Sequence, residues 1–181
     1  MAGMETVKEW VETIREDIEA LKAVLDSNGA EKEARKFAAA GLNYLVARMD
    51  LVPDWEESIG VMDDVFVLRI AADLAGQHGL GDDLSVSDTT ALGRLTNESD
   101  AIENIIDAEL YAHLRTYVAR LVDDAVRGRT PAQLVDDEEA RKALYADVDA
   151  DLKRIPPAPF ADPDQLLAKF KSYLHHKLDA R

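Results

Sequence analysis

The segment from position 44 to 64, YLVARMDLVPDWEESIGVMDD, gathers the side chains whose types and spacing could do chemistry. Its candidate functional cluster comprises Tyr44, Asp50, Asp54, Trp55, Asp63 and Asp64. Carboxylates that converge can bind a hard divalent cation, or share a proton and act as acid and base. One hypothesis is therefore a carboxylate-lined site for a divalent cation, with hydrolysis as its chemistry.

The same aspartates also suit structural roles in a bent helical corner. Pro53 cannot continue a helix, so the helix before it must end and the chain must turn. Asp50 and Asp54 can accept hydrogen bonds from backbone amides of that turn. Asp63 and Asp64 fall where a following helix begins, and negative side chains there face the positive end of the helix dipole. Each carboxylate can thus be explained without a ligand.

Two cations and a tryptophan belong to the same neighbourhood. Arg48 and Arg69 are the cations that could neutralise the acids, and Trp55 suits a lid over the junction between the two helices. Networks of structural ion pairs produce the same pattern of charges as reaction sites, so we favour the structural role. The cation or acid–base site stays the alternative, and no cofactor is predicted.

Hydrophobic residues at helical spacing predict the elements that must position this segment. Helices are expected over about 5–25, 31–48, 61–77, 87–97, 100–127 and 131–153, with a last one after Asp162. Their ends are predicted at Asn28-Gly29, Ser87, Ser99, Gly128, the capping box from Thr130 to Gln133, and Asp162-Pro163. No segment alternates with the period of a strand. The prediction is an all-α fold, an irregular bundle of about seven helices built around a helical hairpin.

Two of these helices carry patterns that bear on packing and on partners. The apolar stripe of the first helix comprises Val7, Val11, Ile14, Ile18, Leu21 and Leu25. It suits packing within the chain's own bundle, or docking of a partner chain or a second copy. In the second helix, the small residues Ala38 to Gly41 would let a neighbouring helix approach closely or would border an apolar-ligand pocket. The third helix is apolar nearly all round, as in a helix buried between others.

Proline residues mark the one predicted boundary in the chain. We expect a helical domain over residues 1–155, with the hairpin at 37–75. The Pro156–Pro159 stretch is a stiff extended spacer. The C-terminal helix that follows it, within residues 156–181, is expected to dock on the same domain.

Composition excludes several classes of protein. The chain has 36 acidic and 21 basic side chains and a net charge of −15, a field that repels nucleic acids and anionic lipid surfaces. It has no cysteine, which excludes disulfides and thiolate chemistry. No apolar run reaches the length that spans a bilayer, and the first residues do not resemble a signal peptide. These features predict a soluble, cytoplasmic protein.

Familiar signatures of helical and hydrolytic enzymes are missing. None of the four histidines follows a glutamate at the spacing that di-iron bundles use. There is no HExxH motif, no glycine-rich phosphate loop and no serine nucleophile motif. His175 and His176 belong to a basic tail that could pair with the acidic body. Enzymatic activity stays uncertain and is the less favoured prediction.

The central segment resembles the YkvA-like family of bacterial proteins. The resemblance rests on Tyr44, the run from Asp50 to Asp54 (DLVPD) and the run from Ile59 to Asp64 (IGVMDD). It covers about residues 37–75 and implies a helical hairpin, but no activity, because the family is itself a domain of unknown function. Relatives often have a proline near Arg48 and apolar residues where this chain has Glu56-Glu57-Ser58. Two acids there would be costly against lipid, which argues against the membrane association suggested for many relatives.

Together these features favour an interaction or scaffold module over an enzyme. The expected mode is packing of a helix into a groove, with a protein partner or a second copy, and the apolar stripe is a possible contact surface. Neither a nucleic acid partner nor insertion into a membrane is expected.

Overall fold

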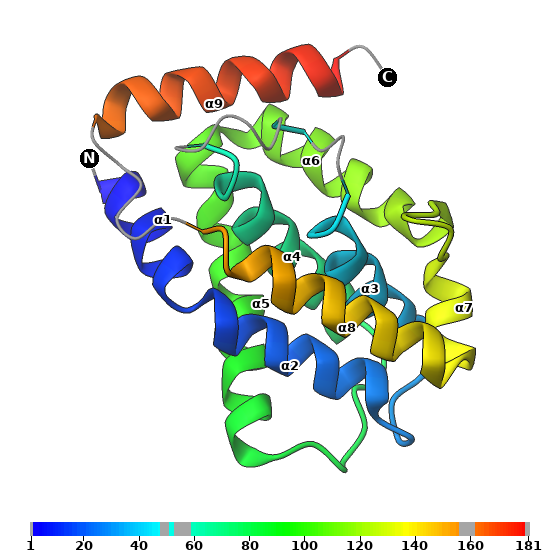
Figure 1. The fold of residues 1–181 in the computed structure, drawn as a ribbon. Coiled ribbons are helices and arrows are strands. Elements are labelled where there is room, and N and C mark those ends of the chain that lie inside the picture. The colour runs from blue at the N-terminus through cyan, green and yellow to red at the C-terminus, as the bar shows by residue number, and fades with distance from the viewer. Residues whose placement is uncertain (1, 48–50, 53–58, 156–161, 180–181) are drawn as a thin grey trace.

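The computed structural model describes residues 2–47, 51–52, 59–155 and 162–179 (Figure 1). The prediction of an all-α fold is confirmed: within these ranges the chain forms nine α-helices, more than the seven expected, and no strand beyond a single bridge between Val126 and Arg129. The elements are α1 (Ala2–Glu12), α2 (Ile14–Asp26), α3 (Lys32–Tyr44), α4 (Met62–Gly76), α5 (Val86–Ile106), α6 (Ala108–Arg120), the 3-10 helix η1 (Leu121–Asp123), α7 (Pro131–Asp136), α8 (Glu138–Leu152) and α9 (Pro163–Leu178).

Helix α4 occupies the centre of the bundle, and α3 packs against it more extensively than any other pair of helices does (Figure 1). Most residues of α4 are buried on every side, as its apolar sequence predicted. The small residues of α3 serve this contact. A Cβ atom on Gly41 would lie 2.9 Å from the Cβ atom of Ala71, so α3 can approach α4 this closely only with glycine at that position.

The apolar stripe of the first predicted helix faces the core. Five of its residues are buried and Val11 is half-buried. The expected single helix is interrupted at Thr13, which has φ −95° and ψ 0°. The Thr13 hydroxyl donates a hydrogen bond to the carbonyl oxygen of Trp10, a local interaction that competes with regular helix geometry.

Helix ends are predicted well where a complete capping motif is present. The capping box of Thr130 and Gln133 opens α7, and Asp162 caps α9 by accepting a hydrogen bond from the amide of Gln165. Both predictions are confirmed. The segment from 131 to 153 was expected as one helix, but Asp137 adopts an extended conformation and caps a separate helix, α8.

Three other predicted ends are wrong: those at Ser87 and Ser99, and the stop at Gly128, because α6 already ends at Arg120. Helix α5 begins after Ser85 rather than Ser87, and it continues through Ser99, which is buried and within hydrogen-bonding distance of the Tyr111 hydroxyl (3.2 Å). The break comes instead at Asp107, which has a φ of 87° and caps α6 through the amide of Leu110. Because Asp107 supplies both the positive φ and the cap, the chain needs no glycine at this break. The glycine that usually signals a helix end is therefore missing from the sequence.

The loop after α2 also differs from the prediction. Asn28-Gly29 does not adopt the left-handed conformation; the Ser27 hydroxyl accepts hydrogen bonds from the amides of Gly29 and Ala30 instead. The glycine that adopts a positive φ at this crossing is Gly81, in the neighbouring loop. A Cβ atom there would lie 2.8 Å from the Ser27 hydroxyl oxygen, so this close crossing of two loops requires glycine.

The C-terminal helix α9 lies alongside α6 and also contacts α1 (Figure 1). Its buried residues are Phe170, Leu174 and Leu178, and the ring of Phe170 packs edge-on against Phe66 of α4 with 5.1 Å between centroids. The predicted spacer Pro156–Pro159 lies outside the described residues.

Candidate functional site

The predicted cluster begins with a buried hydrogen-bonded corner around Tyr44, the last residue of α3. The Tyr44 hydroxyl donates to the Asp63 carboxylate at 2.5 Å and accepts from the amide of Leu51 at 3.0 Å. The amide of Val52 donates to the same Asp63 oxygen at 3.4 Å. Tyr44 and Asp63 are 2% and 0% exposed, so this bonding takes place away from solvent.

This corner fastens the start of α4 to the end of α3. Asp63 lies in the first turn of α4, where the helix dipole also favours its negative charge. The Asp63 carboxylate accepts hydrogen bonds from the Tyr44 side chain of α3 and from the backbone between the two helices. These bonds hold the end of α3 against the start of α4. Asp64 lies in the same first turn and is half-buried.

The remaining members of the cluster, Asp50, Asp54 and Trp55, lie outside the described residues, as does Arg48. The convergence of four carboxylates therefore stays a prediction. Among the residues that the structure does describe, no group of three or more histidine, aspartate or glutamate side chains could hold a metal ion.

Arg69 does not neutralise the predicted cluster, and that expectation is wrong. Its guanidinium lies between α2 and α5, where it contacts the carboxylates of Asp17 at 3.3 Å and Glu98 at 2.8 Å. It also donates to the carbonyl oxygen of Val65, and it lies over the Trp10 ring at 4.2 Å from the centroid. The side chain is fully buried, so its charge has to be matched within the protein.

A second arginine completes this ion network, in which Arg69 and Asp17 are buried and Arg94 and Glu98 are half-buried. Arg94 of α5 contacts Asp17 at 2.5 Å and Glu98 at 3.5 Å, and it donates to the Thr13 hydroxyl at 3.1 Å. Two arginines thus face two carboxylates, and the formal charges balance. The network joins the α1–α2 junction to α4 and α5.

Burial dominates the electrostatics of this network. It raises the pKa of Asp17 above its usual value, although Arg69 and Arg94 act in the opposite direction. It likewise lowers the pKa of Arg69, against the effect of Asp17 and Glu98. Such a network specifies how helices pack, and removing one member leaves the others with uncompensated charge.

Sequence reasoning missed Asp17, Arg94 and Glu98 as members of a site. One signal was available: Asp17 directly precedes Ile18 of the apolar stripe, and Arg69 lies in a helix that is otherwise apolar on nearly every face. Charges in such positions predict buried partners. The sequence does not say which helices are neighbours, so the partners themselves could not be named.

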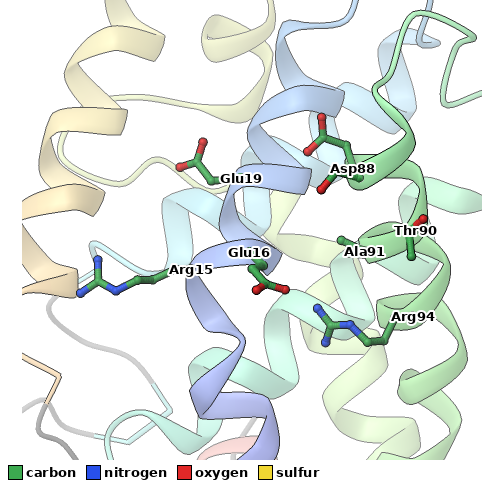
Figure 2. A pocket seen from close by; sticks show the side chains of 8 residues that line it. Arg15, Glu16, Glu19, Asp88, Thr90, Ala91 and Arg94 are labelled. Atoms are coloured by element: carbon green, nitrogen blue, oxygen red, sulfur yellow. The ribbon is translucent and has the colours of Figure 1, made fainter.

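The described part of the chain also has two surface pockets. The α2–α5 groove has a volume of about 530 Å³ and is lined by Arg15, Glu16, Glu19, Ser87, Asp88, Thr90, Ala91 and Arg94. Figure 2 shows Glu16 of α2 and Arg94 of α5 extending toward one another, while Arg15 extends away toward α8. The α6–α9 pocket has a volume of about 490 Å³ and is lined by His113, Thr116, Tyr117, Arg120, Asp124, Leu178 and Asp179.

One wall of the α2–α5 groove belongs to a longer acidic surface. Five exposed glutamates follow α1 and α2 at spacings of four and three residues, and we call them the glutamate row: Glu5, Glu9, Glu12, Glu16 and Glu19. Each lies two positions before a residue of the buried stripe, which on a helix is nearly the opposite side. The same spacing that buries the stripe therefore presents the row to solvent.

None of the helices in the described part of the chain is long and apolar enough to cross a membrane. The basic tail pairs with the body as expected, since Lys171 of α9 contacts Asp107 at 3.6 Å.

No family model, curated protein or solved structure matches the chain. The likeness to the YkvA-like family accordingly rests on the motif between Tyr44 and Asp64.

Proposed function

We propose that this protein is a protein-interaction module, and that it binds a positively charged partner segment along the glutamate row. The single observation that carries the proposal is the division of α1 and α2 into a buried apolar face and a solvent-facing row of glutamates. The row supplies carboxylates on two consecutive helices, and the α2–α5 groove lies beside its last two members.

The partner is recognised by charge rather than by an apolar contact. The Val7–Leu25 stripe packs within the chain's own bundle, as favoured from the sequence, and the alternative that it docks a partner is wrong. Val86 is the one large hydrophobic side chain that is strongly exposed among the described residues. A net charge of −15 also draws basic partners by long-range attraction.

The hydrogen bonds around Asp63 support the scaffold role of the central segment. Its carboxylate is used to close the corner between α3 and α4. We also propose that the chain is a YkvA-like protein. The close packing of α3 on α4 supports this proposal, because the resemblance implies a helical hairpin. The divalent-cation hypothesis has no comparable support among the described residues.

The test is binding of a fluorescent, lysine-rich helical peptide whose lysines repeat at spacings of four and three. Anisotropy titrations compare the wild type with Glu9→Gln/Glu12→Gln/Glu16→Gln. The matched control removes the same charge from exposed acids elsewhere, in Glu103→Gln/Glu109→Gln/Asp123→Asn. We expect the row variant to weaken binding at least about tenfold and the control to weaken it far less. Equal losses in both variants, or no binding to the wild type, would refute the proposal.

A further inference from the structure

The α6–α9 pocket contains two charged side chains that have no partner within the described part of the chain. It lies where the C-terminal half of α6 meets the end of α9, two helices that pack side by side (Figure 1). Arg120 and Asp124 both line it. Neither side chain forms an ion pair or hydrogen bond with another residue in the described part of the chain.

Arg120 differs from the other described arginines in the contacts of its guanidinium. Every other arginine within the described ranges contacts a carboxylate or a backbone carbonyl. Its place in the last turn of α6 suits the helix dipole, but that interaction leaves the guanidinium donors open. A planar guanidinium that faces a pocket is well suited to bind a carboxylate in two parallel hydrogen bonds.

Asp124 supplies the complementary charge. The other carboxylate of the pocket, Asp179, is already engaged, because its two oxygens contact the Nδ1 atoms of His113 at 3.4 Å and His175 at 3.3 Å. Among the described residues that line the pocket, one cation, Arg120, and one anion, Asp124, are therefore available to a ligand. A purely anionic ligand would meet Asp124 and the field of a chain with net charge −15, whereas a net-neutral ligand avoids that repulsion.

The pocket also has apolar surface beside these charges. Leu178 is almost fully buried against α6, and the ring of Tyr117 packs edge-on against Tyr44 at 6.3 Å between centroids. The volume of about 490 Å³ lies in the range of small-molecule sites. We infer that the α6–α9 pocket binds a small zwitterion of the free amino acid class. Its carboxylate pairs with Arg120, its ammonium group with Asp124, and its side chain lies against Tyr117 and Leu178.

The α2–α5 groove does not offer this chemistry. Its two arginines are engaged by the protein, Arg94 with Asp17 and Arg15 with the carbonyl oxygen of Leu152. It therefore serves as a built-in control. The inference is independent of the proposed function, because it uses other helices and other charges.

The experiment is calorimetric titration of the full chain with each proteinogenic amino acid in turn. The best binder is then compared with its N-acetyl derivative, which lacks the ammonium group, and its amide, which lacks the carboxylate. Both derivatives, and the variants Arg120→Gln and Asp124→Asn, are expected to weaken binding at least about tenfold. The control variants Arg15→Gln and Glu16→Gln are expected to leave it unchanged.

The side chains of Arg120 and Asp124 are both exposed, so their substitution should leave the fold intact. Circular dichroism of the two variants verifies this. Two results would overturn the inference. One is the absence of saturable binding for every amino acid up to about 10 mM, a concentration beyond weak specific affinities. The other is equal binding by the blocked derivatives or by the Arg120→Gln protein.

Discussion

At the scale of single residues, the hydroxyl of Tyr44 is the atom on which the α3–α4 corner depends. In Tyr44→Phe the buried amide of Leu51 loses its acceptor, and the hydrogen bond to Asp63 is lost as well. We expect the free energy of unfolding to fall by about 2–3 kcal/mol, the cost of leaving buried polar groups unsatisfied. Urea denaturation followed by circular dichroism measures it.

Tyr145→Phe is the matched control, since the Tyr145 hydroxyl donates to Asp26 at the surface and water can replace it. Its expected cost is below about 1 kcal/mol. Similar losses in the two variants would show that the corner around Tyr44 does not hold the hairpin closed.

Arg69 gives the second prediction at this scale. Replacing it with methionine leaves Asp17 with Arg94 alone and Glu98 with less compensation. We expect Arg69→Met to destabilise the protein by about 3–5 kcal/mol, as when one partner of a buried ion pair is removed. The comparison is Lys32→Met, which breaks an exposed pair with Asp136 and should cost less than about 1 kcal/mol. A loss for Arg69→Met no larger than this would mean that the network contributes little.

At the scale of elements, the contact between α3 and α4 sets the geometry of the hairpin. Alanine at position 41 would bring its Cβ atom to 2.9 Å from Ala71, and the helices would have to separate. Although alanine favours a helix over glycine by about 1 kcal/mol, the overpacking should cost about 1–3 kcal/mol, so the net effect of Gly41→Ala is destabilising.

The chain provides a control of opposite sign in α5. A Cβ atom at Gly93 meets nothing within 4 Å, so Gly93→Ala should stabilise the protein by about 0.5–1 kcal/mol through helix propensity alone. Thermal or urea denaturation of both variants tests the pair. A gain in stability for Gly41→Ala would show that α3 and α4 are packed less closely than the structure has them.

The elements themselves were predictable to the extent that local chemistry encodes them. The all-α class, the buried α4 and the starts of α7 and α9 followed from periodicity and complete capping motifs. The breaks at Asp107 and Asp137 did not, because a single aspartate both ends one helix and caps the next without a glycine or proline. The partners of Arg69 were also out of reach, since helical periodicity shows which face is buried and not which helix covers it.

At the scale of the whole molecule, the net charge of −15 is the property that no single contact explains. Within the described part of the chain, Glu19 is the only member of the glutamate row with an ion pair, to Lys22 at 2.9 Å. The folded state therefore concentrates negative charge along the row that the unfolded chain spreads out. Salt screens exposed charges over about 10 Å at 0.1 M ionic strength. We therefore expect the melting temperature to rise by a few degrees when sodium chloride is raised from about 10 to 200 mM.

The glutamate row should account for much of this salt dependence. Replacing its five glutamates with glutamine removes five negative charges from one surface without touching the core. The melting temperature of that variant should be higher than that of the wild type at low salt and should respond less to added salt. Calorimetry at both ionic strengths measures the difference. If added salt instead lowered the melting temperature of the wild type, attraction within the ion pairs would outweigh repulsion among the exposed carboxylates. A basic partner would then relieve no repulsion by binding to the glutamate row.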